Sequence, residues 1–299
     1  MVLGPTASGK TRLASYLAAQ LDGEIISADS RQVYKQLDIG TGKDLGEYTV
    51  EGKIIPYHAI NIVEPSEQFY LHQFVEVLKN SFDEISSKNK WPIICGGSGL
   101  YLDALHKDFS FTQIKEDFEL RAALEHVSKP ELVARLLTFP SELIAQVDQN
   151  SMKRLIRGIE IATFRKANPD FIKTQTLPYK PFYLGIKTEK EERSKNIYQR
   201  LITRLDEGMI EEAESLLKNG ISHERLQLFG LEYKFLSWFL QNKISREELI
   251  TQLHLAIVQF SKRQMTWFRK MEKEGVRIHW IDASAEPLEV LGELKKALS

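Results

Sequence analysis

The sequence predicts an α/β fold in which a parallel sheet is interrupted by a small all-helical insertion. Three observations predict this fold class. Short apolar runs alternate with helical patterns over the first hundred residues and again toward the end of the chain. A glycine-rich loop joins the first apolar run to the first helical pattern. Strand-like runs are absent between about residues 107 and 178.

Five apolar runs have the composition of short buried strands. Strands that alternate with helices form parallel sheets, and ligands bind where the carboxyl ends of such strands meet. We therefore expect the loops Gly4–Thr11 and Gly96–Gly99 to converge with Asp29, which follows the second run. The five predicted strands are residues 2–3, 23–28, 91–95, 181–187 and 277–281.

Apolar spacing predicts the helices, and it divides the chain into a discontinuous core, residues 1–106 and 179–299, and an insertion, residues 107–178. Prolines separate the short helical patterns of the insertion. In the core we expect one long charged helix over 189–218 and further helices over 13–21, 74–85, after Gly230, and over 246–273. In the insertion we expect helices over 118–127, 131–138, 141–148 and 152–165.

Composition excludes several classes of protein. The 299 residues are 42% hydrophobic and 27% charged, which is ordinary for a globular protein. The single cysteine, Cys95, cannot form an internal disulfide, and the start of the chain lacks the pattern of a secretory signal. The uncharged stretch from Trp91 to Leu102 is too short to cross a bilayer. We expect a cytoplasmic monomer without a membrane partner.

The net charge of −1 hides two basic segments. Residues 151–166 carry five basic side chains and one acidic, and residues 262–277 carry six basic and two acidic. Basic segments on an acidic background can form a phosphate-binding face, or they can be the solvated faces of helices. Charge alone leaves both interpretations open.

The strongest motif, GPTASGKT, fits the pattern G-x4-G-K-[ST] between a strand and a helix. Its glycines let successive backbone N–H groups face phosphate oxygens at the positive end of the next helix. The lysine adds a cation, and the last hydroxyl can reach a phosphate-bound Mg2+. The motif predicts a P-loop NTPase-like core that binds a phosphate or diphosphate. It comprises Gly4, Pro5, Thr6, Ala7, Ser8, Gly9, Lys10 and Thr11.

The motif does not identify the phosphate compound. A nucleotide hydrolase usually has a second apolar strand that ends in a metal-assisting aspartate. The strand over 91–95 ends in Gly96, and the nearest equivalent acid is Asp29, after the strand over 23–28. Asp29 could assist a metal, act as a general base, or cap the following turn. ATP hydrolysis is therefore not implied.

Four sequence blocks together resemble the tRNA dimethylallyltransferase family, whose members are also called tRNA isopentenyltransferases. They are GPTASGKT at 4–11, ISADSRQVYKQLDIGTGK at 26–43, GGSGLYL at 96–102 and SKRQMTWFRK at 261–270. The blocks occur in the family's order and extend over nearly the whole chain. The resemblance implies transfer of a five-carbon prenyl group from dimethylallyl diphosphate to N6 of the adenine at position 37 of tRNA, 3′ of the anticodon.

The resemblance also implies roles on the donor side. The phosphate loop holds the diphosphate leaving group, and Lys10, Thr11 and Mg2+ stabilise the charge that develops there. Arg200 matches a family arginine that reaches the diphosphate, with Arg204 as the alternative. Either arginine could instead lie on a solvated helix face.

On the acceptor side, Asp29 matches the family's catalytic carboxylate. An exocyclic adenine amine is a poor nucleophile, so a carboxylate that orients the N–H and accepts its proton is needed. Asp38 and Thr41 are expected to support it or to make structural hydrogen bonds. The implied tRNA contacts are Asp29, Ser30, Arg31, Gln32, Ser98 (where the family usually has threonine), Arg121, Lys153, Arg154, Leu155, Ile156 and Arg157.

The remaining conspicuous residues predict no further site. The seven histidines lack metal-ligand spacing. We expect Cys95 to be a packed thiol, and Trp267 and Phe268 to be core residues, with stacking on a base as the alternative. In place of the family's G-Y-[KR] block, residues 230–234 read Gly-Leu-Glu-Tyr-Lys, with two additional residues between the glycine and the tyrosine. No RNA contact is therefore assigned there. Three rival functions share the phosphate loop: a small-molecule kinase, prenylation of free adenine nucleotides, and an RNA-binding nucleotide switch.

Overall fold

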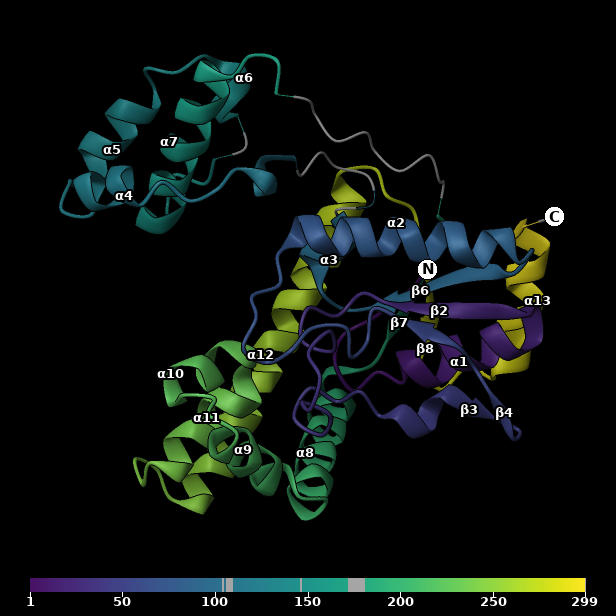
Figure 1. The fold of residues 1–299 in the computed structure, drawn as a ribbon. Coiled ribbons are helices and arrows are strands. Elements are labelled where there is room, and N and C mark those ends of the chain that lie inside the picture. The colour runs from purple at the N-terminus through teal and green to yellow at the C-terminus, as the bar shows by residue number, and fades with distance from the viewer. Residues whose placement is uncertain (104, 106–109, 146, 172–180, 299) are drawn as a thin grey trace. The chain divides into compact units, whose positions relative to one another are not determined.

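The computed structural model describes residues 1–103, 105, 110–145, 147–171 and 181–298 (Figure 1). Residues 106–109 and 172–180, where we expected the insertion to begin and end, lie outside the described residues. The chain forms two compact units. Unit 1 comprises Met1–Phe69, Gln73–Leu105 and Leu177–Ser299, and unit 2 comprises Tyr70–His72 and His106–Thr176.

Unit 1 contains a six-stranded sheet in the order β5-β2-β6-β1-β7-β8, in which every neighbouring pair is parallel. The α/β prediction is therefore confirmed. The edge strand β5 was not predicted, because two residues are too few to show a periodic pattern. The strands are β1 (Val2–Leu3), β2 (Gly23–Ser27), β5 (Tyr57–His58), β6 (Trp91–Gly96), β7 (Tyr183–Lys187) and β8 (Ile278–Asp282).

Helices cover both faces of this sheet, which explains why its central strands are continuous apolar runs. Helix α1 (Lys10–Leu21) packs with α13 (Pro287–Leu298) on one face, through Leu17 and Val290. Figure 1 shows α2 (Leu71–Ser87) on the opposite face. There Phe74 stacks on Tyr101 of the short helix α3 (Gly99–Asp103). A small hairpin, β3 (Thr49–Val50) and β4 (Lys53–Ile54), follows the 3-10 helix η1 (Leu45–Tyr48).

The helices that follow β7 form a second hydrophobic cluster within unit 1. One expectation was wrong here: the helix predicted over 189–218 is two helices. Gly208, with φ of 101°, separates them because this left-handed conformation ends one helix and precedes the next. The helices of this cluster are α8 (Lys190–Asp206), α9 (Met209–Lys218), α10 (His223–Leu226), α11 (Leu231–Leu240) and α12 (Arg246–Lys273), with the 3-10 helix η3 (Gln227–Phe229).

Unit 2 is helical over its described residues, apart from connecting turns. Its core is formed by leucines and isoleucines on the inward faces of three helices, including the fully buried Leu155 and Ile159. Ser128 and Glu131 form a capping box at one helix, and Ser151 caps another. The elements are η2 (Ser110–Gln113), α4 (Phe118–Leu124), α5 (Lys129–Leu136), α6 (Ser141–Ile144) and α7 (Met152–Ala167).

Across the described ranges of both units, every helix is too short or too polar to cross a membrane.

The packing of α12 against the sheet generates a stability prediction. Phe268 is fully buried and lies 6.1 Å from the ring of Trp280 in β8. We expect Phe268→Ala to lower the free energy of unfolding by about 3–5 kcal/mol, because the substitution leaves a cavity. Urea denaturation followed by tryptophan fluorescence measures this directly.

The matched control is Leu255→Ala on the same helix, where the side chain is 57% exposed and the expected change is below about 0.5 kcal/mol. Equal losses for the two variants would show that α12 does not pack as described.

Candidate active site

A cavity of about 810 Å3 opens at the carboxyl edge of the sheet in unit 1. The structure brings together here most residues predicted for the donor and acceptor sites of the core. Gly4 and Pro5 are buried just before this cavity, and they do not line it. The predicted residues that line it are Thr6, Ala7, Ser8, Gly9, Lys10, Thr11, Asp29, Ser30, Arg31, Gln32, Ser98, Arg200 and Arg204.

The phosphate loop turns sharply before α1. Ala7 and Gly9 have φ of 58° and 76°, and α1 begins at Lys10 with no side chain capping its first amides. The hydroxyl of Ser8 is buried without a hydrogen-bond partner among the described residues. Burial lowers the pKa of Lys10, whose Nζ lies 3.5 Å from the carbonyl oxygen of Pro5. The uncapped helix amides, the Ser8 hydroxyl and the Lys10 ammonium group thus lie together at a helix N-terminus, which is an arrangement that can bind an anion.

Gln264 of α12 joins two loops of the cavity, and the sequence alone had assigned it no role. Its Oε1 accepts the N–H of Thr6 at 2.9 Å, and its Nε2 donates to the carbonyl of Gly97 at 2.9 Å. The glutamine lies within the SKRQMTWFRK block, but its partners are more than 160 residues away. It fixes the phosphate loop relative to the loop that follows β6.

Trp267 corrects a second expectation. We predicted it as a core residue together with Phe268; Phe268 is indeed fully buried, but Trp267 lines the cavity. Its indole lies directly over Gly99, where an added Cβ would approach within 2.3 Å. Only glycine is tolerated at that position, so the tryptophan and the GGSGLYL block form one surface.

Asp29 follows β2 at the edge of the cavity. Its Oδ1 accepts the N–H of Arg31 at 2.8 Å, so the carboxylate caps the turn that it begins. Gln32, three residues after Asp29, accepts a hydrogen bond from the Ser27 hydroxyl at 2.8 Å and donates to the carbonyl of Gly42 at 3.0 Å. The turn therefore holds Asp29 in the same cavity that the phosphate loop lines.

Two arginines of α8 bind one carboxylate within the cavity. Arg200 and Arg204 both donate to Asp44, Arg204 at 3.1 Å. Burial lowers the pKa of Arg200, chiefly by removing water. Burial would raise the pKa of Asp44, but the two guanidinium groups outweigh it and hold the pKa below its usual value. Asp44 directly follows the predicted DIGTGK block, which is the only sequence signal that could have identified it.

Glu47, three residues after Asp44, is one of the acidic residues that line the cavity, with Asp29, Asp44 and Glu232. Burial and then the neighbouring Asp44 raise its pKa above that of an ordinary glutamate. Asp44 and Glu47 therefore differ in acidity: the pKa of Asp44 is lowered and that of Glu47 is raised.

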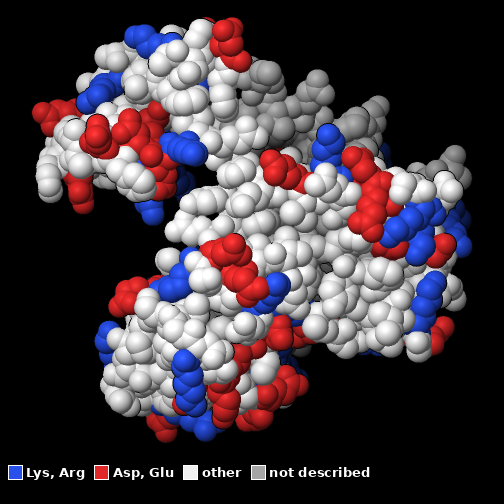
Figure 2. Space-filling model, in the orientation of Figure 1, with Lys and Arg blue, Asp and Glu red and all other residues white. Residues whose placement is uncertain are grey.

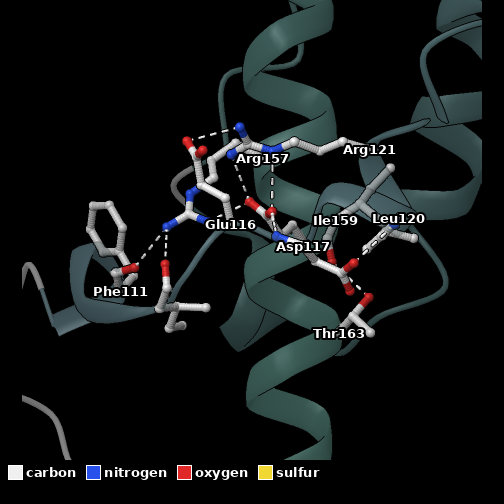
Figure 3. Close-up of polar contacts among 10 residues, drawn as sticks. Phe111, Glu116, Asp117, Leu120, Arg121, Arg157, Ile159 and Thr163 are labelled. Atoms are coloured by element: carbon white, nitrogen blue, oxygen red, sulfur yellow. Dashed lines mark hydrogen bonds and ion pairs between the residues drawn. The ribbon is translucent and has the colours of Figure 1, made fainter. Parts of the chain in front are cut away.

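Basic side chains of unit 2 are arranged around Glu160 (Figure 3). The Glu160 carboxylate is almost fully buried and accepts hydrogen bonds from Arg121 at 3.0 and 3.1 Å, from Arg157, and from the N–H of Asp117. Arg157 also donates to the carbonyl of Ile114 at 2.6 Å. Arg121 and Arg157, which we expected to contact RNA, are thus engaged within unit 2.

The structure corrects one predicted RNA contact outright. The Leu155 side chain is fully buried in the core of unit 2, so it stabilises the helix and is not accessible to a ligand. Ile156 is half-buried. Lys153 and Arg154 are exposed, and Arg154 pairs with Asp148 at 2.5 Å. On the face drawn in Figure 2, basic and acidic side chains are interspersed over each unit.

The Glu160 cluster generates a pH-dependent prediction. Burial would raise the pKa of Glu160, but the hydrogen bonds from Arg121 and Arg157 lower it. The ionised carboxylate therefore stabilises unit 2 above the ordinary glutamate pKa of 4.5, and this stabilisation is lost as the pH falls through the lowered value. At pH 7 we expect Glu160→Gln to lower the free energy of unfolding of unit 2 by about 3–5 kcal/mol.

Hydrogen exchange of the α7 amides, corrected for intrinsic rates, measures this effect. The difference in protection between Glu160→Gln and wild type is expected to shrink as the pH falls below 4.5, and the control Glu119→Gln, at an exposed acid of α4, should differ from wild type by almost nothing at any pH. A difference that stays constant with pH would contradict the proposed charge network.

Similarity to known proteins covers nearly the whole chain. Residues 32–271 match the family model described as IPP transferase. The tRNA dimethylallyltransferase 1 of Parabacteroides distasonis is 43% identical and covers 100% of this chain and 96% of its own length. The tRNA dimethylallyltransferase 2 of Shewanella sediminis is 45% identical, with 98% and 97% covered.

A solved structure, the full-length tRNA isopentenylpyrophosphate transferase of Bacillus halodurans, superposes with a TM-score of 0.71. It is 30% identical, and the match covers 99% of this chain and 94% of that protein. A eukaryotic dimethylallyltransferase acting on tRNA has a TM-score of 0.78 at 24% identity, covering 94% of this chain and 73% of that one, and supports the fold.

Proposed function

This chain belongs to the IPP transferase family, and we propose that it transfers the dimethylallyl group of dimethylallyl diphosphate to N6 of the adenine at position 37 of tRNA. The observation that carries the proposal is one cavity that combines an anion site with a carboxylate. The phosphate loop and Lys10 line it together with Asp29, Arg200 and Arg204. A reaction that expels diphosphate while a nitrogen loses a proton requires these two features in one place.

The donor is bound through its diphosphate. The amides at the start of α1, the unpaired Ser8 hydroxyl and Lys10 Nζ are positioned to receive its oxygens. When the allylic C–O bond breaks, its electron pair leaves with the diphosphate, and these donors stabilise the added negative charge. Arg200 and Arg204 add two cations, whose present partner Asp44 fixes their position.

Thr11 is the residue proposed to bind Mg2+, jointly with the diphosphate. Among the described residues no three histidine, cysteine or acidic side chains are placed to hold a metal by themselves. Mg2+ is commonly bound by one or two protein oxygens together with substrate phosphates, so the Thr11 hydroxyl at the phosphate loop fits that mode. Bound there, the ion would neutralise charge on the leaving group.

Asp29 is the proposed general base. The exocyclic amine of adenine forms the new N–C bond, and the proton that it loses passes to the Asp29 carboxylate. The hydrogen bond from Arg31 keeps that carboxylate at the edge of the cavity.

The tRNA is proposed to contact the exposed Lys153 and Arg154 of α7, and Ser30, Arg31, Gln32 and Ser98 in the cavity. Adenine must leave the stack of the anticodon loop to reach a buried donor, and unstacked loop bases are the usual targets of RNA recognition. Arg121 and Arg157 contribute indirectly, by holding the helix that carries the exposed cations.

Mass spectrometry tests this function. We expect tRNA incubated with the protein, Mg2+ and dimethylallyl diphosphate to gain one five-carbon group on a single adenosine. Parallel reactions with AMP as acceptor and with labelled ATP as donor separate the rival functions. Unmodified tRNA, together with prenylated AMP or a phosphorylated product, would overturn the proposal.

Removing the proposed base should slow the chemical step and leave RNA binding intact. We expect Asp29→Ala to lower the transfer rate by about 10²- to 10⁴-fold, the range for a general base, with tRNA affinity nearly unchanged. Single-turnover assays and filter binding measure the two quantities. Asp206→Ala, an exposed acid at the end of α8, is the control, and an Asp29→Ala rate equal to that of the control would exclude the role.

Lys10 should act on the donor. We expect Lys10→Ala to raise the KM for dimethylallyl diphosphate and to lower kcat, because a half-buried cation at the diphosphate is lost. Steady-state kinetics at saturating tRNA provide both values. The matched control is Lys79→Ala, at an exposed lysine of α2. Unchanged donor kinetics in Lys10→Ala would contradict a diphosphate at this loop.

A further inference from the structure

The loop from Asp38 to Gly42 is held by a carboxylate that lies outside the cavity. Glu212, on α9, accepts three consecutive backbone N–H groups: Oε2 takes those of Asp38 at 2.7 Å and Ile39 at 2.8 Å, and Oε1 takes that of Gly40 at 2.9 Å. Hydrogen bonds to a charged acceptor are stronger than those between neutral groups. Glu212 therefore determines where this loop begins relative to the helices of unit 1.

Tyr233, on α11, completes the attachment. Its hydroxyl donates to Oε1 of Glu212 at 2.6 Å, and its fully buried ring packs on Gly40. An added Cβ at Gly40 would lie 2.6 Å from the ring, so the backbone has no room to move toward it. Burial, and then the charge of Glu212, raise the pKa of Tyr233, which keeps its hydroxyl protonated as a donor.

The far end of the same loop contacts both halves of the proposed active site. The carbonyl of Gly42 accepts a hydrogen bond from Gln32, which lies in the turn that begins at Asp29. On its other side, an added Cβ at Gly42 would lie 1.8 Å from Nη2 of Arg204 and 2.8 Å from Nη2 of Arg200. Any shift of this backbone must move the glutamine, the arginines, or both.

A buried lysine fixes the loop from the sheet side. Lys43 is almost fully buried, and its Nζ donates to Asp38 Oδ1 at 2.6 Å and to the carbonyl of Tyr34 at 2.7 Å. Lys43 and Glu212 thus secure the two ends of one short loop. Of the two, only Glu212 belongs to a helix of the cluster, so it attaches the start of this loop to that cluster.

We propose that Glu212, supported by Tyr233, is a positioning residue for the transfer reaction. It sets the backbone of Gly40–Gly42, and through it Gln32 on the acceptor side and Arg200 and Arg204 on the donor side. The inference rests on the proposed function. Misplacing reacting groups by about 1 Å can cost about 100-fold in rate even when the change lies far from the chemistry, which gives the expected scale.

The test compares Glu212→Gln with Glu211→Gln, its exposed neighbour on α9. The amide nitrogen of glutamine cannot accept, so at least one of the three loop N–H groups loses its partner. We expect kcat for transfer to fall about 10- to 100-fold in Glu212→Gln and to stay within about twofold of wild type in Glu211→Gln. The affinity for tRNA is expected to remain within about twofold in both variants.

If Glu212 had a purely structural role, the activity of Glu212→Gln would fall only in proportion to the fraction of the protein that is folded. Rates are therefore measured well below the melting temperature and divided by the folded fraction from circular dichroism. Combining Glu212→Gln with Gln32→Ala provides a second readout: the two effects should be less than additive, because both act through Gly42. Should Glu212→Gln fail to fold, Tyr233→Phe removes one hydrogen bond at constant packing, and we expect kcat to fall about 3- to 10-fold.

A folded Glu212→Gln protein with the kcat of Glu211→Gln, or a folded Tyr233→Phe protein with the kcat of wild type, overturns the inference. A loss of activity that vanishes after correction for the folded fraction also overturns it. Fully additive effects with Gln32→Ala also overturn it. Failure of the proposed function is distinguishable, since in that case the wild-type protein itself forms no prenylated tRNA.

Discussion

The parallel direction of all six strands is the constraint on which the site depends. The carboxyl ends of parallel strands lie at the same edge of the sheet, so loops that are distant in the sequence meet at that edge. The phosphate loop follows β1, Asp29 follows β2, and the GGSGLYL block follows β6, and all three line one cavity. Because β6 lies between β1 and β2, the separation of the phosphate loop from Asp29 is set by the spacing of these three adjacent strands.

Electrostatics adds a second constraint to this arrangement. Expelling a diphosphate requires several cations, yet cations that face one another in a cavity repel. The structure meets both requirements by placing Asp44 between Arg200 and Arg204, and it leaves Lys10 at a helix N-terminus. In unit 2 the same solution recurs, since Glu160 holds Arg121 and Arg157. In each unit one carboxylate, Asp44 or Glu160, binds two arginines and fixes their positions.

The features that could be predicted from the sequence are those that are encoded locally. The strand composition indicated the parallel α/β sheet, and the motif GPTASGKT placed a glycine-rich turn at the start of α1. The break at Gly208 was missed because the apolar spacing continues across it, although glycine in a helical pattern is a recognised helix terminator. The burial of Leu155 could have been inferred from its apolar character within a basic helix.

The residues that could not be identified from the sequence act across large separations in the chain. Gln264 bonds to Thr6 258 residues away, and Glu212 bonds to Asp38 at a separation of 174. No periodic pattern relates such positions, since they are brought together only when the helical cluster packs beside the sheet. Arg157 is an intermediate case, because Glu160 lies three residues on and the pairing was visible in the sequence.

The most direct measurement is a crystal structure of the protein with an unreactive analogue of dimethylallyl diphosphate. We expect the diphosphate to lie on the amides of residues 6–11, within hydrogen-bond distance of Lys10, and the carbon to be transferred to face Asp29 across the cavity. A diphosphate bound elsewhere, or an isoprenoid group directed away from Asp29, would contradict the proposed mechanism.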